Sequence, residues 1–131
     1  MPRCVVDAAA CPDFDVLVAQ LERRFPNVRR DLADLYSRIA QEYLIGDRVP
    51  RLKKGASYAG AIWKYGCPNS DRRSGRSYGY RVIGFYDSAT GKLYPIFIYD
   101  HPDKSDITAA EVDRAMTALG NALEAARRHP T

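Results

Sequence analysis

Apolar residues recur with helical spacing over the first third of the chain. The first stripe follows the i, i+3, i+4, i+7 positions of one helix face: Phe14, Leu17, Val18, Leu21 and Phe25. It predicts a helix over Asp13–Phe25 that Pro26 ends, because a proline inside a helix loses a hydrogen bond. A second stripe has the same spacing: Val28, Leu32, Leu35, Ile39 and Tyr43. It predicts another helix, capped by Asn27 and running to about Leu44, so the two form a helical hairpin.

Three later segments are rich in aromatic and β-branched residues and are separated by turn residues. They predict strands at Tyr58–Gly66, Gly79–Asp87 and Lys92–Tyr99. The sequence DSATGK between the last two strands has Asp and Gly where a short hairpin loop needs them. Pro95 has no N–H to donate, which predicts a bulge or an edge position in the third strand. A short apolar run around Cys4–Asp7 is a further candidate strand.

The last helix carries the clearest local signal. Thr108 and Glu111 have the spacing of a capping box, and Ile107 and Val112 have that of the accompanying hydrophobic staple. The order helix, helix, strand, strand, strand, helix within 131 residues predicts a single domain over residues 1–131. We expect an α+β fold, in which an N-terminal helical hairpin packs on a small antiparallel β-sheet with a C-terminal helix.

Composition narrows the class of protein. Hydrophobic residues make up 46% of the chain and charged residues 27%, which excludes wholesale disorder. No apolar run is long enough for a transmembrane helix and no signal-peptide order is present, so we expect a cytoplasmic protein without membrane association. Cys4, Cys11 and Cys67 lack zinc-like spacing, and we expect reduced thiols with no metal and no cofactor.

The net charge of +4 is unevenly distributed. The stretch from Arg48 to Arg81 holds nine basic residues and one acidic residue, Asp71, whereas the rest of the chain is mildly acidic. Such asymmetry favours a polyanionic partner, most often a nucleic acid. The alternative is a solvated surface loop that binds nothing. The cations that we expect to contact nucleic-acid phosphates are Lys53, Lys54, Arg72, Arg73 and Arg76.

Two further cations lie inside predicted strands. Lys64 stands between Trp63 and Tyr65, so the alternation of a strand directs it to the face opposite those two rings. Arg81 lies in the next predicted strand, and antiparallel pairing of the two strands would place both cations on one open sheet face. The alternative is a pair of exposed cations on a solvated face.

The segment IYDHPDKSDI, between the last strand and the last helix, carries His101 and Lys104. Histidine exchanges a proton near neutral pH, and cations stabilise the negative charge that develops on a phosphate under attack. Together with Lys64 and Arg81, these residues predict an RNA cleavage site at which the ribose 2′-hydroxyl attacks the adjacent phosphorus. We take all four as candidate catalytic residues.

The same segment allows two other interpretations. It can serve only as a turn that caps the last helix, with His101 exposed. It can also form a metal site, because Asp100, His101, Asp103 and Asp106 lie close in sequence and are hard or borderline ligands. A metal-dependent nuclease would lose its activity in EDTA.

The sequence YGYRVIGFYDSATGKLYPIFIYDHPDKSDITAAEVDRAM resembles the second half of RelE/HigB-type toxins of bacterial type II toxin–antitoxin systems. VPRLKKGASYAGAIWKYGCP resembles the loop and the lysine-bearing strand upstream of it, so the resemblance covers roughly Phe25–Leu119. It implies a RelE-like fold and a metal-independent endoribonuclease that cleaves mRNA, commonly on the ribosome, and so inhibits translation. It also implies a cognate antitoxin protein, with which the toxin forms a hetero-oligomer, beside mRNA and the ribosome as partners.

On this resemblance, Lys64 matches the family's strand lysine and Arg81 matches the arginine that follows a glycine–aromatic pair. Lys104 falls among the basic positions of the final turn. The chain departs from the family at Gly66, where a second basic residue is common.

Two more departures lie near the end of the last strand. His101 stands where lysine is frequent, and Asp100 replaces a small polar residue. Some of these toxins use a tyrosine in the last segment for catalysis. Thr108 lies near that place here, which leaves Tyr99 as the substitute.

The same fold family includes ParE-type toxins, which poison DNA gyrase without cutting RNA. The alternative function is therefore a non-catalytic ParE-like toxin or nucleic-acid-binding module that acts on DNA gyrase or a regulatory complex. A pure binder has no need for Lys64 and Arg81 on one sheet face, so the placement of these two cations discriminates between the two functions.

Overall fold

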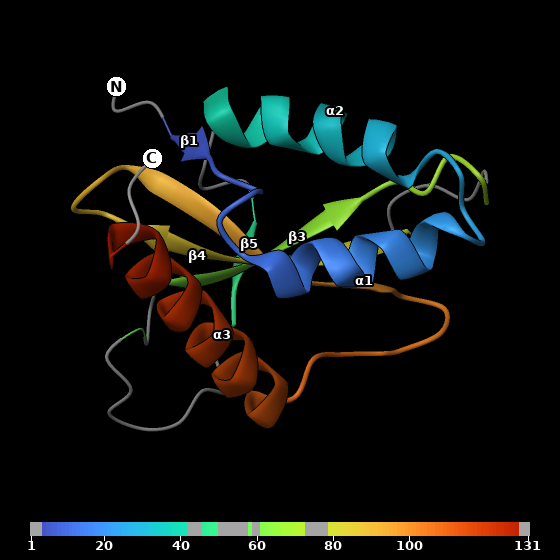
Figure 1. Ribbon diagram of the computed structural model, residues 1–131. Coiled ribbons are helices and arrows are strands. Elements are labelled where there is room, and N and C mark those ends of the chain that lie inside the picture. The colour runs from blue at the N-terminus through green and yellow to red at the C-terminus, as the bar shows by residue number, and fades with distance from the viewer. Residues whose placement is uncertain (1–3, 42–45, 50–57, 59–60, 73–78, 129–131) are drawn as a thin grey trace.

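The computed structural model describes residues 4–41, 46–49, 58, 61–72 and 79–128. Within these residues, a short first strand is followed by two helices, four strands and a last helix, as Figure 1 shows. Their order is β1 (Val5–Val6), α1 (Pro12–Glu22), α2 (Val28–Gln41), β2 (Asp47–Arg48), β3 (Ile62–Cys67), β4 (Tyr80–Asp87), β5 (Lys92–Asp100) and α3 (Ala109–Arg128). The predicted α+β class is confirmed: two N-terminal helices pack on a sheet and a third helix ends the chain.

The strands form one sheet in the order β1-β5-β4-β3-β2. The expected antiparallel pairing holds from β5 through β4 and β3 to β2. At the other edge, β1 pairs with β5 in parallel, which makes the sheet mixed. β1 occupies the position expected from the run around Cys4–Asp7, whereas the short strand β2 has no counterpart among the predicted strands.

The hairpin between β4 and β5 forms where DSATGK predicts it. The Gly91 N–H donates to the Asp87 carbonyl over 2.8 Å, and the Ala89 N–H donates to Asp87 Oδ1 over 3.0 Å. Gly91 has a φ of 71°, a left-handed conformation that side chains disfavour and glycine adopts freely. The turn therefore fixes the register of the two longest strands.

A β-bulge interrupts this pairing at the proline. Gly84 pairs with Pro95 and Ile83 pairs with Phe97, so Ile96 is an extra residue on β5. Pro95 cannot donate a ladder hydrogen bond, and a bulge is one of the places where a sheet accepts such a residue. The bulge predicted for Pro95 is confirmed.

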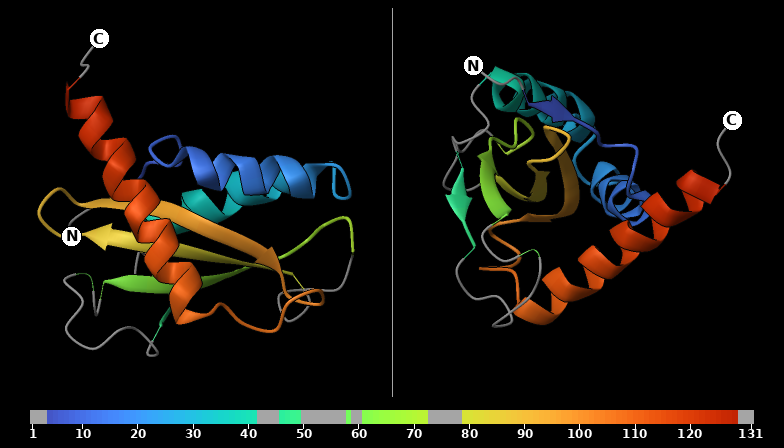
Figure 2. Two further views of the ribbon diagram at one scale, coloured as in Figure 1. Left: turned by 60° about the horizontal axis from the view of Figure 1, so that its bottom comes forward. Right: turned by 90° about the vertical axis from the view of Figure 1, so that its left-hand side faces the viewer.

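α1 and α2 lie along one side of the sheet, and α3 crosses in front of the sheet in the left view of Figure 2. The predicted stripes supply the core, since Phe14 and Val18 of α1 and Leu35 and Ile39 of α2 are all buried. α1 ends at Glu22, before the predicted end at Phe25, which stays buried in the turn that follows.

α3 begins with the predicted capping box. The Thr108 N–H donates to Glu111 Oε1 over 2.9 Å, and the Glu111 N–H donates to Thr108 Oγ1 over 3.1 Å. Ile107 and Val112, the predicted staple, are both buried. Among the described residues, no helix is long and apolar enough to cross a membrane.

Candidate active site on the sheet

Lys64 and Arg81 lie on the same face of the sheet, as predicted. The register of β3 and β4 pairs Lys64 with Ile83 and Gly66 with Arg81, and paired residues direct their side chains to the same side. Because Lys64 and Gly66 are two positions apart on one strand, Lys64 shares its side with Arg81. Tyr65, between Lys64 and Gly66, points to the opposite side of the sheet, where it is 1% exposed.

The glycine at position 66 leaves space for the Arg81 side chain. A Cβ atom at Gly66 would lie 3.9 Å from Arg81 Nη1, so the guanidinium lies over this residue. Arg81 Nη1 also donates to the Tyr80 carbonyl over 3.2 Å. The absence of a side chain at Gly66 thus makes room for the neighbouring cation.

Tyr99 of β5 is the third residue of this face. It pairs directly with Arg81 and is 5% exposed. Its hydroxyl is buried and meets the geometry of a hydrogen bond with none of the described residues. Burial raises the pKa of Tyr99 to about 12, and the nearby Asp106 carboxylate adds to the rise while Arg81 opposes it. The phenol therefore stays protonated at neutral pH.

A carboxylate completes the cluster. Lys64 Nζ lies 3.4 Å from Asp106 Oδ1, and the same oxygen accepts the Ile107 N–H over 2.8 Å. The side chain of Lys64 is 30% exposed and that of Asp106 is 47% exposed, so both are open to solvent. We define the active face as Lys64, Arg81, Tyr99 and Asp106.

Lys104 is paired with a carboxylate outside this group. Its Nζ lies 2.9 Å from Glu111 Oε1 in the first turn of α3. Partial burial acts to raise the Glu111 pKa, but the Thr108 N–H and Lys104 together hold it below its ordinary value. Lys104 thus supports the capping box, and the structure gives it a partner outside the active face.

His101 stands at the end of β5, two residues after Tyr99. Its N–H donates to the Gly79 carbonyl over 2.9 Å, which extends the β4–β5 pairing by one residue. Its side chain is half-buried, and its Nδ1 atom is buried with no hydrogen-bond partner among the described residues. The alternative in which His101 is simply exposed is therefore not what the structure shows.

Arg72 is anchored inside the protein. Its Nε donates to Asp100 Oδ2 over 2.8 Å, its Nη2 lies 2.6 Å from the same oxygen, and Asp103 Oδ1 lies 3.7 Å from Nη2. Its guanidinium carbon lies 5.0 Å from the centre of the Phe25 ring. Asp100 is 2% exposed, so this pair joins the segment after β3 to the end of β5.

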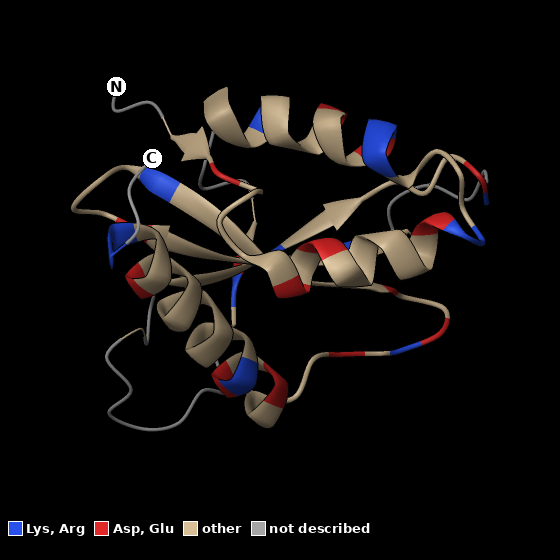
Figure 3. Ribbon diagram, in the orientation of Figure 1, with Lys and Arg blue, Asp and Glu red and all other residues tan. Residues whose placement is uncertain are grey.

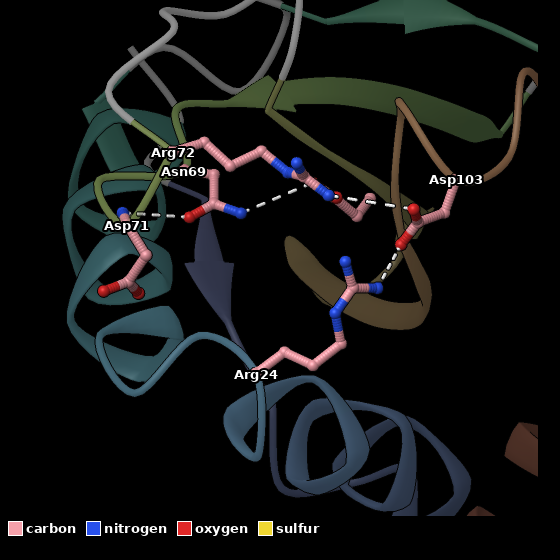
Figure 4. Close-up of polar contacts among 6 residues, drawn as sticks. Arg24, Asn69, Asp71, Arg72 and Asp103 are labelled. Atoms are coloured by element: carbon pink, nitrogen blue, oxygen red, sulfur yellow. Dashed lines mark hydrogen bonds and ion pairs between the residues drawn. The ribbon is translucent and has the colours of Figure 1, made fainter.

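Further polar contacts surround Arg72, as Figure 4 shows. Arg24 Nη1 lies 2.5 Å from Asp103 Oδ2, and the Asn69 side-chain amide donates to Asp100 Oδ1 over 3.4 Å. The Asp71 carboxylate accepts both the backbone and the side-chain N–H of Asn27 over 3.0 Å. The Asn27 side chain therefore binds Asp71 at the start of α2. The network ties the turn after β3 to the helical hairpin.

Of the five cations predicted to contact RNA, Arg72 is thus placed against two carboxylates. The other four, Lys53, Lys54, Arg73 and Arg76, lie outside the described residues.

The segment between β5 and α3 was also predicted as a possible metal site. Acidic and basic residues stand side by side in the segment between β5 and α3, as Figure 3 shows. Within the described ranges, no three His, Cys, Asp or Glu side chains gather that could hold a metal ion.

Cys4, Cys11 and Cys67 are free and buried, and burial raises the pKa of each thiol.

Sequence reasoning found Lys64 and Arg81 from the alternation of the strands. It gave Asp106 as a turn residue or a metal ligand, and Tyr99 only as a substitute on the resemblance. The signal for Tyr99 is the hairpin register, since a fixed turn and one bulge place it opposite Arg81. Comparisons of the chain with protein-family models, with curated proteins and with solved structures found no match.

Proposed function

We propose that this protein is a RelE/HigB-like toxin. In this proposal it is an endoribonuclease that cleaves mRNA on the ribosome without a metal ion, and so inhibits translation. The observation that carries the proposal is the shared face of Lys64 and Arg81, with Tyr99 directly opposite Arg81. A module that only binds its partner through a basic surface does not need two cations and a phenol on one face of a sheet. This arrangement suits a transferring phosphate.

The cations supply the electrostatic part of the reaction. When the ribose 2′-hydroxyl attacks the adjacent phosphorus, negative charge grows on the non-bridging oxygens. Lys64 and Arg81 are positioned on adjacent strands to bind those oxygens, and fixed donors stabilise a transition state more than they stabilise the ground state. The protonated Tyr99 hydroxyl gives a further hydrogen bond on the same face.

His101 is our candidate for the second proton transfer. The leaving 5′-oxygen needs a proton as its bond to phosphorus breaks, and an imidazolium gives one near neutral pH. His101 follows Tyr99 by two residues. Lys104 has a supporting role in this scheme because its ammonium is bound to Glu111.

The partners follow from the same proposal. Lys53, Lys54, Arg73 and Arg76 contact phosphates of the mRNA or of ribosomal RNA, and these contacts give affinity without reading sequence. Arg72 holds the segment before Arg73 in place through Asp100. A cognate antitoxin covers the toxin in a hetero-oligomer until it is released.

The test uses a defined mRNA with and without 70S ribosomes, in EDTA, followed by primer extension. We compare the parent with a Lys64→Ala/Arg81→Ala variant and with a Lys92→Ala/Arg30→Ala control, which removes the same charge from exposed or half-exposed positions outside the active face. We expect the parent and the control to cut only with ribosomes, and the active-face variant to cut at least about 100-fold more slowly.

Equal cutting by a folded active-face variant would contradict the proposal. Cuts on naked RNA in EDTA would support metal-independent cleavage but contradict the dependence on the ribosome. Loss of cutting in EDTA would favour the metal-dependent alternative. A folded parent, free of antitoxin, that cuts under no condition would favour the non-catalytic alternative on DNA gyrase.

A further inference from the structure

The proposed reaction leaves one proton without an acceptor. The 2′-hydroxyl must lose its proton as its oxygen attacks the phosphorus, and a positioned side chain speeds such a transfer. The cations Lys64 and Arg81 have no free electron pair for it. Tyr99 is a protonated phenol in a buried position and does not accept it readily.

Asp106 is the carboxylate that reaches this group. Its Oδ1 lies 3.4 Å from Lys64 Nζ, a residue that faces the same side of the sheet as Arg81. Its position is fixed by the backbone, because the same oxygen accepts the Ile107 N–H over 2.8 Å. With its side chain 47% exposed, a substrate can approach the carboxylate from solvent.

The other carboxylates of this region are committed to structural contacts. Asp100 and Asp103 bind Arg72, and Asp103 also binds Arg24. Glu111 accepts the Thr108 N–H and pairs with Lys104. Asp106 instead contacts Lys64, a cation of the active face.

We propose that Asp106 is the general base of the cleavage reaction, an inference that rests on the proposed function. Its carboxylate takes the 2′-hydroxyl proton while the bond from the 2′-oxygen to phosphorus forms. The bond from phosphorus to the 5′-oxygen breaks, and a proton from His101 passes to that oxygen. The products are a 2′,3′-cyclic phosphate and a 5′-hydroxyl end. Lys64 then has two contacts, with the attacked phosphate and with the base.

Three variants test this role. Asp106→Asn removes the base, Asp106→Glu keeps the charge but shifts it by one methylene, and Asp34→Asn removes the same charge from an exposed position on α2. For each we measure the single-turnover cleavage rate on programmed ribosomes. We also measure affinity for ribosomes that carry an mRNA with one 2′-deoxynucleotide at the cleavage position, which cannot react.

We expect Asp106→Asn to cleave about 10²–10⁴-fold more slowly, the range of general acid–base catalysis. Its affinity for the unreactive ribosome complex should be unchanged or higher, since a negative charge beside the phosphate is gone. Asp34→Asn should behave as the parent. If Asp106→Asn does not fold, Asp106→Glu carries the test, with a rate lowered at least about tenfold at unchanged affinity.

Parent-like or faster cleavage by Asp106→Asn would overturn the inference, and a faster rate would mean that Asp106 competes with the phosphate for Lys64. A fall in cleavage that matches an equal fall in affinity would overturn it as well, since it would mean a structural role. If the parent itself does not cut while its fold is intact, the proposed function fails, and the role of Asp106 fails with it.

Discussion

Arg81 faces Tyr99 directly across β4 and β5, and its other flank is occupied by Gly66 of β3. One residue from each of three adjacent strands therefore forms a row across the sheet. In this row a large cation lies between a position without a side chain and a buried ring. Its guanidinium extends over the glycine, so the size of the residue at position 66 controls where the charge of Arg81 lies.

Substitution of Gly66 tests this control. A Cβ atom there would make an ordinary contact of 3.9 Å with Arg81, so Gly66→Ala should fold and cleave as the parent does. Gly66→Leu should displace the guanidinium and lower cleavage about tenfold or more, because a misplaced catalytic group costs much of its effect. Single-turnover cleavage by both folded variants checks this. Equal rates would show that Arg81 is not held over Gly66.

Removal of the Tyr99 hydroxyl separates stability from activity. Tyr99→Phe should raise the free energy of unfolding by about 1 kcal/mol, because the lost hydroxyl is buried without a partner among the described residues. Cleavage should fall about tenfold, through the loss of a hydrogen bond to the reacting phosphate.

Tyr80→Phe is the matched control, since its hydroxyl is also buried and unpaired within the described residues but its side chain lies on the helix side of the sheet. It should gain similar stability and keep full cleavage. Urea unfolding and single-turnover rates measure the two effects. A Tyr99→Phe variant with parent-like cleavage would remove the phenol from the mechanism.

Loss of the capping box should destabilise α3. Thr108→Ala leaves the Glu111 N–H without its acceptor and should lower the free energy of unfolding by about 1 kcal/mol. Thr117→Ala is the control, because Thr117 is exposed and its hydroxyl donates only to the Asp113 carbonyl of the same helix. Urea unfolding compares the two. An equal effect of both substitutions would count against the capping role.

The pair of Arg72 and Asp100 predicts unequal effects of two similar substitutions. Asp100→Asn removes a buried charge that holds Arg72 and should lower Tm by several degrees. Asp103 is 47% exposed, so Asp103→Asn should change Tm much less. Thermal unfolding monitored by circular dichroism measures both. A larger loss for Asp103→Asn would show that the buried pair does not stabilise this junction.

Buried tyrosines predict unfolding at alkaline pH. Burial raises the pKa of Tyr99 to about 12, and it raises the pKa of Tyr36, Tyr65 and Tyr80 further above the ordinary value of 10. Above pH 10 the unfolded chain therefore holds fewer protons than the folded one. The free energy of unfolding should fall as pH rises, by about 1.4 kcal/mol per pH unit for each tyrosine.

The ultraviolet absorbance of tyrosinate and circular dichroism, followed together, check this prediction. The buried tyrosines should ionise in the same step in which the helices are lost. Full ionisation of all nine tyrosines near pH 10, with the native circular dichroism retained, would contradict it.

The parts of the fold that depend on neighbours in sequence were predictable. The capping box needs only Thr108 and Glu111, and the shared face of Lys64 and Arg81 needs only alternation and an antiparallel pair of strands. Contacts between distant segments were not predictable in this way. Lys64 and Asp106 are 42 residues apart in the sequence. No local pattern indicates that the turn before α3 lies against β3.

The ion pair of Arg72 is a second contact that the sequence could not predict. As one of nine basic residues in its stretch, it carries no local sign that distinguishes it from its neighbours. Its partner Asp100 lies 28 residues away in the sequence. The pairing of β4 with β5 brings that carboxylate within hydrogen-bond distance of Arg72. Charge counting therefore found the cationic region but not which of its members are already neutralised.

The bulge at Ile96 changes the alternation of β5 halfway along the strand. Before it, the even-numbered residue Tyr94 pairs with Phe85, and after it the odd-numbered residue Tyr99 pairs with Arg81. Phe85 and Arg81 share one side of β4, so a single extra residue inverts which side chains of β5 reach that side. If Ile96 instead took a place in the ladder and the pairing ran on without a bulge, Ile98 would lie opposite Arg81 in place of the phenol. One extra residue in β5 thus decides whether a phenol or an aliphatic side chain lies opposite Arg81.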